Sequence, residues 1–444
     1  MIGRNIALML LLAFVFRIFL MLWSFQHPLH KDIYRFRDWA MIPYLYTLSD
    51  PYEAKHITFG IDPLNLPPGT LYLLTGMYRV NIVVAKVIHK VTGASPGSLQ
   101  WVNVQLPNAF LRLPAMLSDI LIGYVIYLLV KKYGDKKRAL LASALYLFNP
   151  AVFYNSSFWG QMDAINNALF MLALYAYDIR KQFLSILSLF LSLFVKLTLV
   201  IVIGPLMALW LWLERNKRQF VLFVALSVAV VLVLTLPLST EPHIWFYQFL
   251  QKNSLGEMNN ITSLAMNFWW VVFKPRIAIG NPTSDFDFTL DTFIGSPEST
   301  AVHVGLPLFT WALVITAVVC VPLVRVVWSL REKALKPKAV FLLLSLFSLV
   351  GYLFLPHMHE RYLYPFFMLM PVSIALTKRY MWAYVLLSFL NFLNLYLVWH
   401  PMLRPALPYN IMNSADFQWL LSLATVVIGM AVYVKSLKFL RSVR

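Results

Sequence analysis

Long apolar runs alternate with short polar segments along almost the whole chain. An α-helix needs about 20 apolar residues to cross a bilayer, and the first run, NIALMLLLAFVFRIFLMLWSF, is long enough. Because no small-residue cleavage site follows it, we expect a retained span. The block 183–213 lies between two basic clusters and must cross an even number of times, so we interpret it as two short spans that meet near Lys196 and Leu197. The pattern then predicts twelve spans: 5–25, 107–130, 139–154, 164–178, two within 183–213, 220–238, 304–324, 339–355, 363–376, 381–399 and 419–434.

The basic residues recur in short clusters between the apolar runs, and this distribution predicts the topology. The densest cluster, KKYGDKKR at 131–138, is expected in the cytoplasm because positive charge stays on the inner side of a membrane. The segments 26–105 and 240–303 then become long extracytoplasmic loops, and both termini are cytoplasmic. Every strong basic cluster falls on one side, which supports the twelve-span count.

The composition excludes a soluble protein. Apolar residues make up 60% of the chain and charged residues 13%, whereas about a quarter of the residues in soluble domains are charged. The net charge of +18 does not indicate nucleic acid, because the basic residues gather on no single face or block. Cys320 is the only cysteine, which leaves no disulfide framework and no cysteine metal site. We therefore expect one all-α integral membrane domain over residues 1–444, in contact with membrane lipids.

Two segments of the first outer loop look amphipathic rather than membrane-spanning. IYRFRDWAMIPYLYTL (33–48) places aromatic and aliphatic residues at helical spacing, with charged residues on the other faces. LYLLTGMYRVNIVVAKVIHKV (71–91) carries three basic residues within an apolar pattern. Both are predicted to be helices that lie in the membrane interface.

The segment Pro356–Tyr362, PHMHERY, places His357, His359, Glu360 and Arg361 at the outer mouth of two spans. Ionisable groups are costly at membrane depth, so such a cluster indicates a functional site. The alternative is that these charges only anchor the helix ends in the headgroup layer.

Other polar residues that topology leaves unexplained fall on the same outer side. Asp32 is a candidate general base, with a helix N-cap as the alternative role. Lys196 and Arg361 are candidates for binding a lipid phosphate, with snorkelling to the interface as the alternative. Arg112 and Asp119 are seven residues apart and could form a structural pair on one helix face. The FWGQMD turn adds three more candidates: Trp159, Gln161 and Asp163.

Metal binding has weak support in the sequence. DFDFTLD (285–291) has a DxD spacing, but no strand or helix pattern flanks it. His357, His359 and Glu360 are too close together on one turn for good ligand geometry. We expect no metal site and no cofactor.

The order of these motifs resembles that of the GT-C membrane glycosyltransferases. The likeness covers residues from about 1 to 400 and comprises the early Asp32, an Asp-Pro-Tyr and a Pro-Pro turn, RLPAMLSD, FNP followed by WGQMD, and HMHERY. The nearest likeness is to the dolichyl-phosphate-glucose-dependent glucosyltransferases of asparagine-linked glycan assembly and to their prokaryotic mannosyltransferase-like relatives.

The resemblance implies a GT-C fold and an inverting transfer of a hexose, glucosyl or mannosyl, from a dolichyl- or undecaprenyl-phosphate donor. The acceptor would be a lipid-linked glycan or a protein on the extracytoplasmic face. By the same likeness Asp32 is the general base, and Arg361, His359, His357 and Lys196 lie near the donor phosphate. The remaining matches are cavity residues: Glu360, Trp159, Gln161, Asp163 and Arg112.

Two departures from the family pattern affect these assignments. Lys31 stands where the eukaryotic enzymes have a glycine before the acid, so Asp38 is the alternative base. Arg361 replaces a lysine, which keeps the charge but changes its geometry. The Pro-Pro turn and the compact length favour the plasma membrane of a prokaryote over the endoplasmic reticulum.

Two other functions fit the same topology. A lipid-linked sugar flippase or transporter would need polar groups along the membrane depth. An oligosaccharide polymerase or ligase would share the topology but use a pyrophosphate-linked donor.

Overall fold

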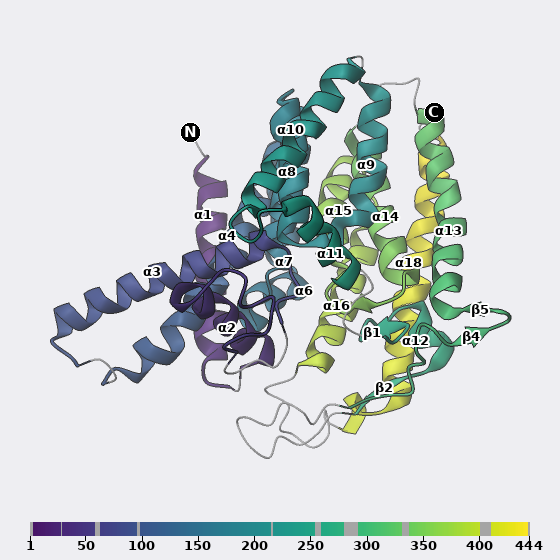
Figure 1. Cartoon of the computed structure of the whole chain (residues 1–444). Coiled ribbons are helices and arrows are strands. Elements are labelled where there is room, and N and C mark those ends of the chain that lie inside the picture. The colour runs from purple at the N-terminus through teal and green to yellow at the C-terminus, as the bar shows by residue number, and fades with distance from the viewer. Residues whose placement is uncertain are drawn as a thin grey trace.

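The computed structural model describes residues 3–27, 29–57, 63–95, 98–214, 216–253, 259–278, 292–330, 337–399 and 410–442. These residues are overwhelmingly helical (Figure 1), as the sequence predicts. The helices are α1 (Arg4–Ser24), α2 (Lys31–Leu45), α3 (Pro68–Thr92), α4 (Gln100–Tyr133), α5 (Lys136–Leu147), α6 (Pro150–Phe153), η1 (Tyr154–Trp159), α7 (Asp163–Asp178), α8 (Gln182–Val195), η2 (Leu197–Leu199), α9 (Val200–Leu213), α10 (Lys217–Thr235), α11 (Pro242–Asn253), α12 (Phe268–Phe273), α13 (Leu308–Leu330), α14 (Pro337–Phe354), α15 (Tyr364–Thr377), α16 (Met381–Val398) and α18 (Ala415–Ser442).

Within the described residues, six very short strands form three pairs. β1 pairs with β6 in parallel, while β2 pairs with β3 and β4 with β5 in antiparallel fashion. Their bounds are β1 (Thr262–Ser263), β2 (Arg276–Ala278), β3 (Thr292–Ile294), β4 (Val302–His303), β5 (Leu306–Pro307) and β6 (Met358–His359). All but β6 belong to the second outer loop or its end.

Eight of the described helices are long and apolar enough to cross a membrane: α1, α3, α4, α10, α13, α14, α16 and α18. Three shorter apolar segments, α8, η2–α9 and α15, lie among them. The predicted break near Lys196 is confirmed, because α8 ends at Val195 and η2 begins at Leu197. The expected span 139–154 is divided, since α5 ends at Leu147 and a new helix starts at Pro150. The count of twelve spans stays a prediction.

The first outer loop contains the two expected helices, with one difference. Helix α3 reaches the length and hydropathy of a span, although the sequence reasoning placed it in the interface. In Figure 1 it projects sideways from the bundle, across the direction of α13 and α18. Helix α1 begins and α18 ends at one end of the bundle, while α2 and β2 lie toward the other.

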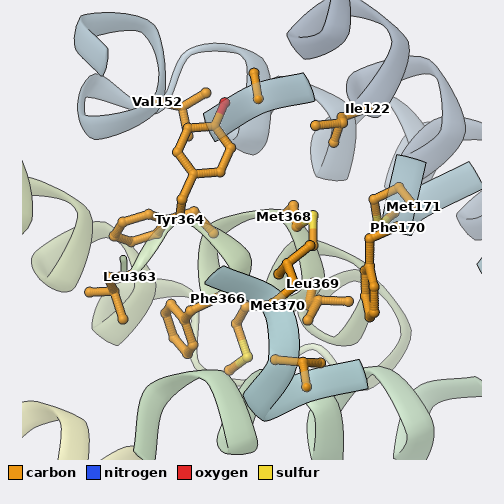
Figure 2. Packing of buried hydrophobic residues seen from close by; sticks show 14 of the residues in the cluster. Ile122, Val152, Phe170, Met171, Leu363, Tyr364, Phe366, Met368, Leu369 and Met370 are labelled. Carbon is orange, nitrogen blue, oxygen red and sulfur yellow. The ribbon is translucent and has the colours of Figure 1, made fainter. Parts of the chain in front are cut away.

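The core of the bundle is centred on α14 and α15, which are buried almost all round. A helix that is apolar on every face belongs in the interior. In Figure 2 the α15 side chains Met368 and Leu369 lie on the side of Phe170 and Met171 of α7. In lipid such packing, rather than a hydrophobic force between helices, holds a bundle together. The packed α14–α15 pair therefore fixes the PHMHERY segment that joins the two helices.

Candidate active site

The carboxylate of Asp32 lies in the first turn of α2. The N-cap is His30, whose side chain accepts a hydrogen bond from the backbone N–H of Asp32 at 3.2 Å. Oδ2 of Asp32 lies 3.2 Å from Nδ1 of His30 and accepts a hydrogen bond from Nε2 of Gln161 at 2.5 Å. Oδ1 lies 3.5 Å from Nη1 of Arg35.

The charge state of this carboxylate follows from its neighbours. Burial raises the pKa of Asp32, while the attraction and hydrogen bonding of His30 lower it. With the further attraction of Arg361 and Arg35, the pKa lies well below its ordinary value. Asp32 is therefore ionised at neutral pH.

The WGQMD turn brings two polar side chains to the site. It follows the π-helix η1, and such π-helical turns often occur at functional sites. Gly160 then adopts φ +88°, where an added Cβ would lie 2.6 Å from Cδ1 of Ile33. A side chain at this position would be both strained and crowded, so the turn requires glycine. The turn directs Gln161 to the α2 carboxylate and places Asp163 at the start of α7.

Asp163 holds two cations from distant parts of the chain. Its Oδ1 accepts a hydrogen bond from Nζ of Lys196 at 2.5 Å, and its Oδ2 lies 3.6 Å from Nε of Arg361. Both cations lie 5.7 Å from the ring of Tyr362. Lys196 occupies the extended residue between α8 and η2, so the break in the apolar block delivers its ammonium to this carboxylate.

In the PHMHERY segment, Glu360 and Arg361 form an adjacent ion pair. Nη1 of Arg361 donates to Oε1 of Glu360 at 2.7 Å, and Nδ1 of His359 lies 3.7 Å from Oε2. Glu360 is fully buried, and its backbone carbonyl accepts a hydrogen bond from Asn391 at 2.7 Å. Burial raises the pKa of Glu360, but the attraction of Arg361 and of His359 lowers it to about 2.

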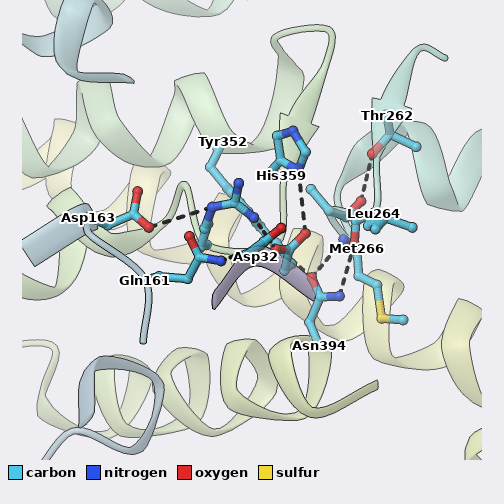
Figure 3. A network of polar contacts seen from close by, with 12 residues as sticks. Asp32, Gln161, Asp163, Thr262, Leu264, Met266, Tyr352, His359 and Asn394 are labelled. Carbon is cyan, nitrogen blue, oxygen red and sulfur yellow. Dashed lines mark hydrogen bonds and ion pairs between the residues drawn. The ribbon is translucent and has the colours of Figure 1, made fainter. Parts of the chain in front are cut away.

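The second outer loop holds the PHMHERY segment in place. Strand β6 within the segment pairs with β1, and its register joins Ser263 to His359. Figure 3 shows Asn394 beneath this pairing, where it donates to the carbonyl of Leu264 at 3.0 Å and accepts from the N–H of Met266 at 3.0 Å. Residues 262–266 of this loop therefore supply a backbone scaffold for the site, a role that the sequence reasoning did not assign.

The result is a compact cluster of opposite charges built from four chain segments. The PHMHERY segment contributes to it together with the start of α2, the WGQMD turn and the break after α8. The carboxylates are Asp32, Asp163 and Glu360, and the cations are Arg35, Lys196 and Arg361.

Arg112 does not pair with Asp119, so the expected structural pair is wrong. Nη1 of Arg112 donates to Oγ of Ser24 at 2.5 Å and to the carbonyl of Ser157 at 3.4 Å. Asp119 instead pairs with Arg17 of α1 at 3.1 Å. The two residues share one helix, but each faces a different partner on α1. Arg112 is fully buried behind the WGQMD turn, where it supports η1.

Three further predicted residues have other surroundings. The buried ring of Trp159 lies 4.9 Å from that of His30. The ring of His357 lies 5.7 Å from that of Phe309 at the start of α13. Asp38, the alternative base, is fully buried within α2.

Within the described ranges, no three His, Cys, Asp or Glu residues are grouped so as to hold a metal ion. The DFDFTLD motif at 285–291 lies outside the described residues.

Sequence reasoning missed His30, Arg35 and Asn391. His30 precedes the first turn of the helix that contains Asp32, and Arg35 lies one helical turn after Asp32. The sequence spacing could therefore have identified both residues. Asn391 lies in the middle of an apolar helix, where an amide usually hydrogen-bonds to another helix or to backbone.

No protein-family model matches the chain, and no curated protein sequence matches it. Among solved structures, ArnT from Cupriavidus metallidurans bound to undecaprenyl phosphate is similar at 13% identity and a TM-score of 0.44, over 98% of this chain and 76% of that one. The apo state of the same protein is similar at 13% identity and a TM-score of 0.46, over 98% of this chain and 75% of that one. The Archaeoglobus fulgidus oligosaccharyltransferase, tethered to an acceptor peptide, is similar at 13% identity and a TM-score of 0.40, over 98% of this chain and 55% of that one. At these identities and TM-scores, the similarity supports no conclusion about the function of this chain. The proposed function therefore depends on the residues of the site.

Proposed function

We propose that the chain is a membrane glycosyltransferase of the GT-C type. It moves a hexose from a polyprenyl-phosphate donor to a lipid-linked glycan or a protein on the extracytoplasmic face, with inversion at the anomeric carbon. The observation that carries the proposal is the charged cluster, in which an ionised carboxylate, Asp32, lies within electrostatic reach of Arg361 and Lys196.

The donor phosphate is assigned to the two cations. A polyprenyl-phosphate sugar brings one negative charge and leaves as a phosphate with greater charge. Cations that offset this developing charge lower the barrier. Lys196 and Arg361 are held by Asp163 and Glu360. The phosphate therefore meets cations that are already placed and shares them with these carboxylates. His359 and His357 are proposed to complete the phosphate site.

The acceptor is assigned to Asp32. A carboxylate can remove a proton from a hydroxyl that attacks the sugar from the face opposite the phosphate. The side chain of Asp32 is 15% exposed, whereas Asp38 is fully buried. Binding of the donor would draw Arg361 toward the phosphate. Since Arg361 lowers the pKa of Asp32, this shift makes Asp32 a stronger base as the substrates assemble.

We further propose that the sugar is glucose or mannose and that the reaction needs no metal ion. Lys196 and Arg361 supply the positive charge that a divalent cation would otherwise provide. An excess of EDTA is expected to leave the transfer rate unchanged, and a loss that Mg²⁺ restores would contradict this part of the proposal. The plasma membrane of a prokaryote is the proposed location.

The test uses purified full-length protein in nanodiscs with radiolabelled donors. Polyprenyl-phosphate glucose and mannose are offered beside the pyrophosphate-linked sugars, together with lipid-linked glycan and peptide acceptors. Transfer from a monophosphate donor supports the proposal, while transfer from pyrophosphate donors alone identifies a polymerase or ligase. A parallel liposome assay measures movement of the lipid-linked sugar between leaflets, and movement without transfer identifies a flippase.

A further inference from the structure

The β4–β5 hairpin carries three exposed apolar side chains within five residues. The exposed fraction is 67% for Val302, 90% for Val304 and 39% for Leu306. In Figure 1 the hairpin projects sideways from the bundle beside the start of α13. Apolar side chains that gather on one projecting element indicate a contact surface. The question is what covers it.

The turn of this hairpin contains a residue that the turn itself does not favour. The two residues between the strands, Val304 and Gly305, have φ of +48° and +79°. Two successive positive φ values are the pattern of a type I′ turn, for which Asn-Gly is the preferred sequence. A β-branched residue is strained in this region. The valine therefore does not serve the turn, and its apolar side chain points to a contact outside the protein.

The base of the hairpin is fixed against the neighbouring helices. Nε1 of Trp311 donates to the carbonyl oxygen of His303 at 2.7 Å, and the N–H of Leu308 donates to the carbonyl of Ala301 at 2.9 Å. The ring of His303 also lies 5.8 Å from that of Phe273 in α12. These contacts hold the hairpin in its projecting position.

The length of α13 gives the depth of the hairpin in the membrane. A helix crosses the hydrocarbon core, about 30 Å thick, with about 20 residues. Arg325 and the exposed ring of Trp328 mark the inner end of α13, because basic and aromatic residues gather at the membrane interface. Counting back about 20 residues from Trp328 reaches Leu308, where α13 begins. The hairpin ends at Pro307 and therefore lies at the opposite boundary of the hydrocarbon core.

The hairpin continues the lipid-facing surface of α13. Between Glu298 and Arg325 the sequence contains no Asp, Glu, Lys or Arg. Exposed aliphatic side chains lie along one face of the helix: Leu313, Val314, Val318, Val321 and Val324. A surface that binds a water-soluble protein has a polar rim, whereas this stretch joins an apolar hairpin directly to an apolar helix face. Lipid is therefore the environment that fits the hairpin.

We propose that the β4–β5 hairpin is a membrane anchor whose tip, Val304, inserts among the lipids at the outer end of α13. Contact with acyl chains and headgroups removes the apolar surface of Val302, Val304 and Leu306 from water, which is favourable. Because the hairpin carries no Asp, Glu, Lys or Arg, neutral lipid is sufficient for this contact. The anchor is independent of sugar transfer.

Backbone hydrogen bonds join the anchor to the PHMHERY segment. The N–H of Ser299 donates to the carbonyl of Asn259 at 2.6 Å, and the N–H of Ile261 donates to the carbonyl of Pro297 at 3.0 Å. The carbonyl of Ile261 in turn accepts from the N–H of His357 at 2.9 Å. The anchored hairpin therefore fixes the height of the PHMHERY segment relative to the lipid surface.

The test places a nitroxide label at the tip of the hairpin in the full-length protein. Val304→Cys is made in a Cys320→Ala background, because Cys320 is the only native cysteine. The protein is placed in phosphatidylcholine nanodiscs, and collisions of the label are measured with oxygen, which dissolves in lipid, and with a water-soluble nickel chelate. Val318→Cys on the exposed face of α13 is the lipid control. Asp416→Cys is the water control, because Asp416 is an exposed carboxylate at the start of α18.

The label at position 304 is expected to collide more with oxygen than with the chelate, as at position 318 and opposite to position 416. A label that collides more with the chelate lies in water, which overturns the proposal. A label shielded from both reagents is covered by protein, either a second copy of the chain or a partner, and this result overturns it equally. If Val304→Cys does not fold, Val302→Cys is labelled instead, and the same results support or overturn the anchor.

Discussion

Replacing Asp163→Asn removes one charge from the site while keeping the shape of the side chain. Asp163 is 3% exposed and Lys196 is 7% exposed, and 2.5 Å separates their charged atoms. Breaking a buried ion pair by removing one partner typically costs about 3–5 kcal/mol, because the other charge is left uncompensated. The charge of Arg361 stays compensated, because Nη1 of Arg361 also donates to Oε1 of Glu360 at 2.7 Å. We therefore expect a loss of about 3 kcal/mol in the free energy of unfolding, centred on Lys196.

A second carboxylate on the same helix provides the control. Asp178 at the other end of α7 pairs with Lys132 at 2.8 Å, and Lys132 is 46% exposed. A surface pair of this kind contributes about 0–1 kcal/mol. Asp178→Asn should therefore change stability by less than about 1 kcal/mol.

The assay is a double-mutant cycle with Asp163→Asn and Lys196→Met, in which unfolding is measured in matched detergent. Residues that share one interaction give coupling energies of about 0.5–3 kcal/mol, and we expect the upper part of this range. Additive effects in the cycle, or a stability loss equal to that of Asp178→Asn, would refute the reasoning.

Three other outcomes follow from the structure. Gly160→Ala should reduce transfer strongly and lower the free energy of unfolding by about 1–3 kcal/mol, because it forces a side chain into a left-handed, crowded turn. The control is Gly204→Ala, which should be near neutral because an added Cβ at Gly204 meets no atom within 4 Å. Asp119→Leu leaves the buried Arg17 without its carboxylate and should cost about 3–5 kcal/mol in unfolding measurements; an unchanged stability would contradict this. Glu360 has its pKa lowered from 4.5 to about 2, so its ionic contribution is complete above pH 4.5 and is lost as pH falls toward 2. Wild-type stability should therefore decline over that window while Glu360→Gln lacks this component, and parallel profiles would contradict the assignment.

The helical pattern was predictable because apolar run length and basic clusters are local properties of the chain. The break at Lys196 could be inferred because two basic clusters enclose one apolar block. The character of α3 was harder to predict, since its apolar content suits a span and its basic residues suit an interface. Residue pattern alone does not decide between these environments.

The site was predictable where polar residues interrupt apolar sequence. Asp163 and Arg361 stood out for this reason, and in the structure the carboxylate of Asp163 forms an ion pair with Arg361. The prediction that Arg112 pairs with Asp119 was wrong, because two residues on one helix face can each bind a different partner on a neighbouring helix.

The pairing of β1 with β6 could not have been foreseen. Two-residue strands carry no periodic signal, and this pairing joins segments almost a hundred residues apart. Its effect on the site is nevertheless direct, because it fixes the backbone beside Glu360 and Arg361. Long-range backbone contacts of this kind require the folded structure.

The central claim is that Asp32 is the base of a sugar transfer. The most direct measurement is the single-turnover transfer rate of Asp32→Asn beside that of Asp38→Asn, with both proteins shown to be folded. Loss of a general base lowers the rate by about 10²–10⁴-fold, and this loss is predicted for Asp32→Asn alone. A wild-type rate in Asp32→Asn, with the loss found in Asp38→Asn instead, would contradict the account.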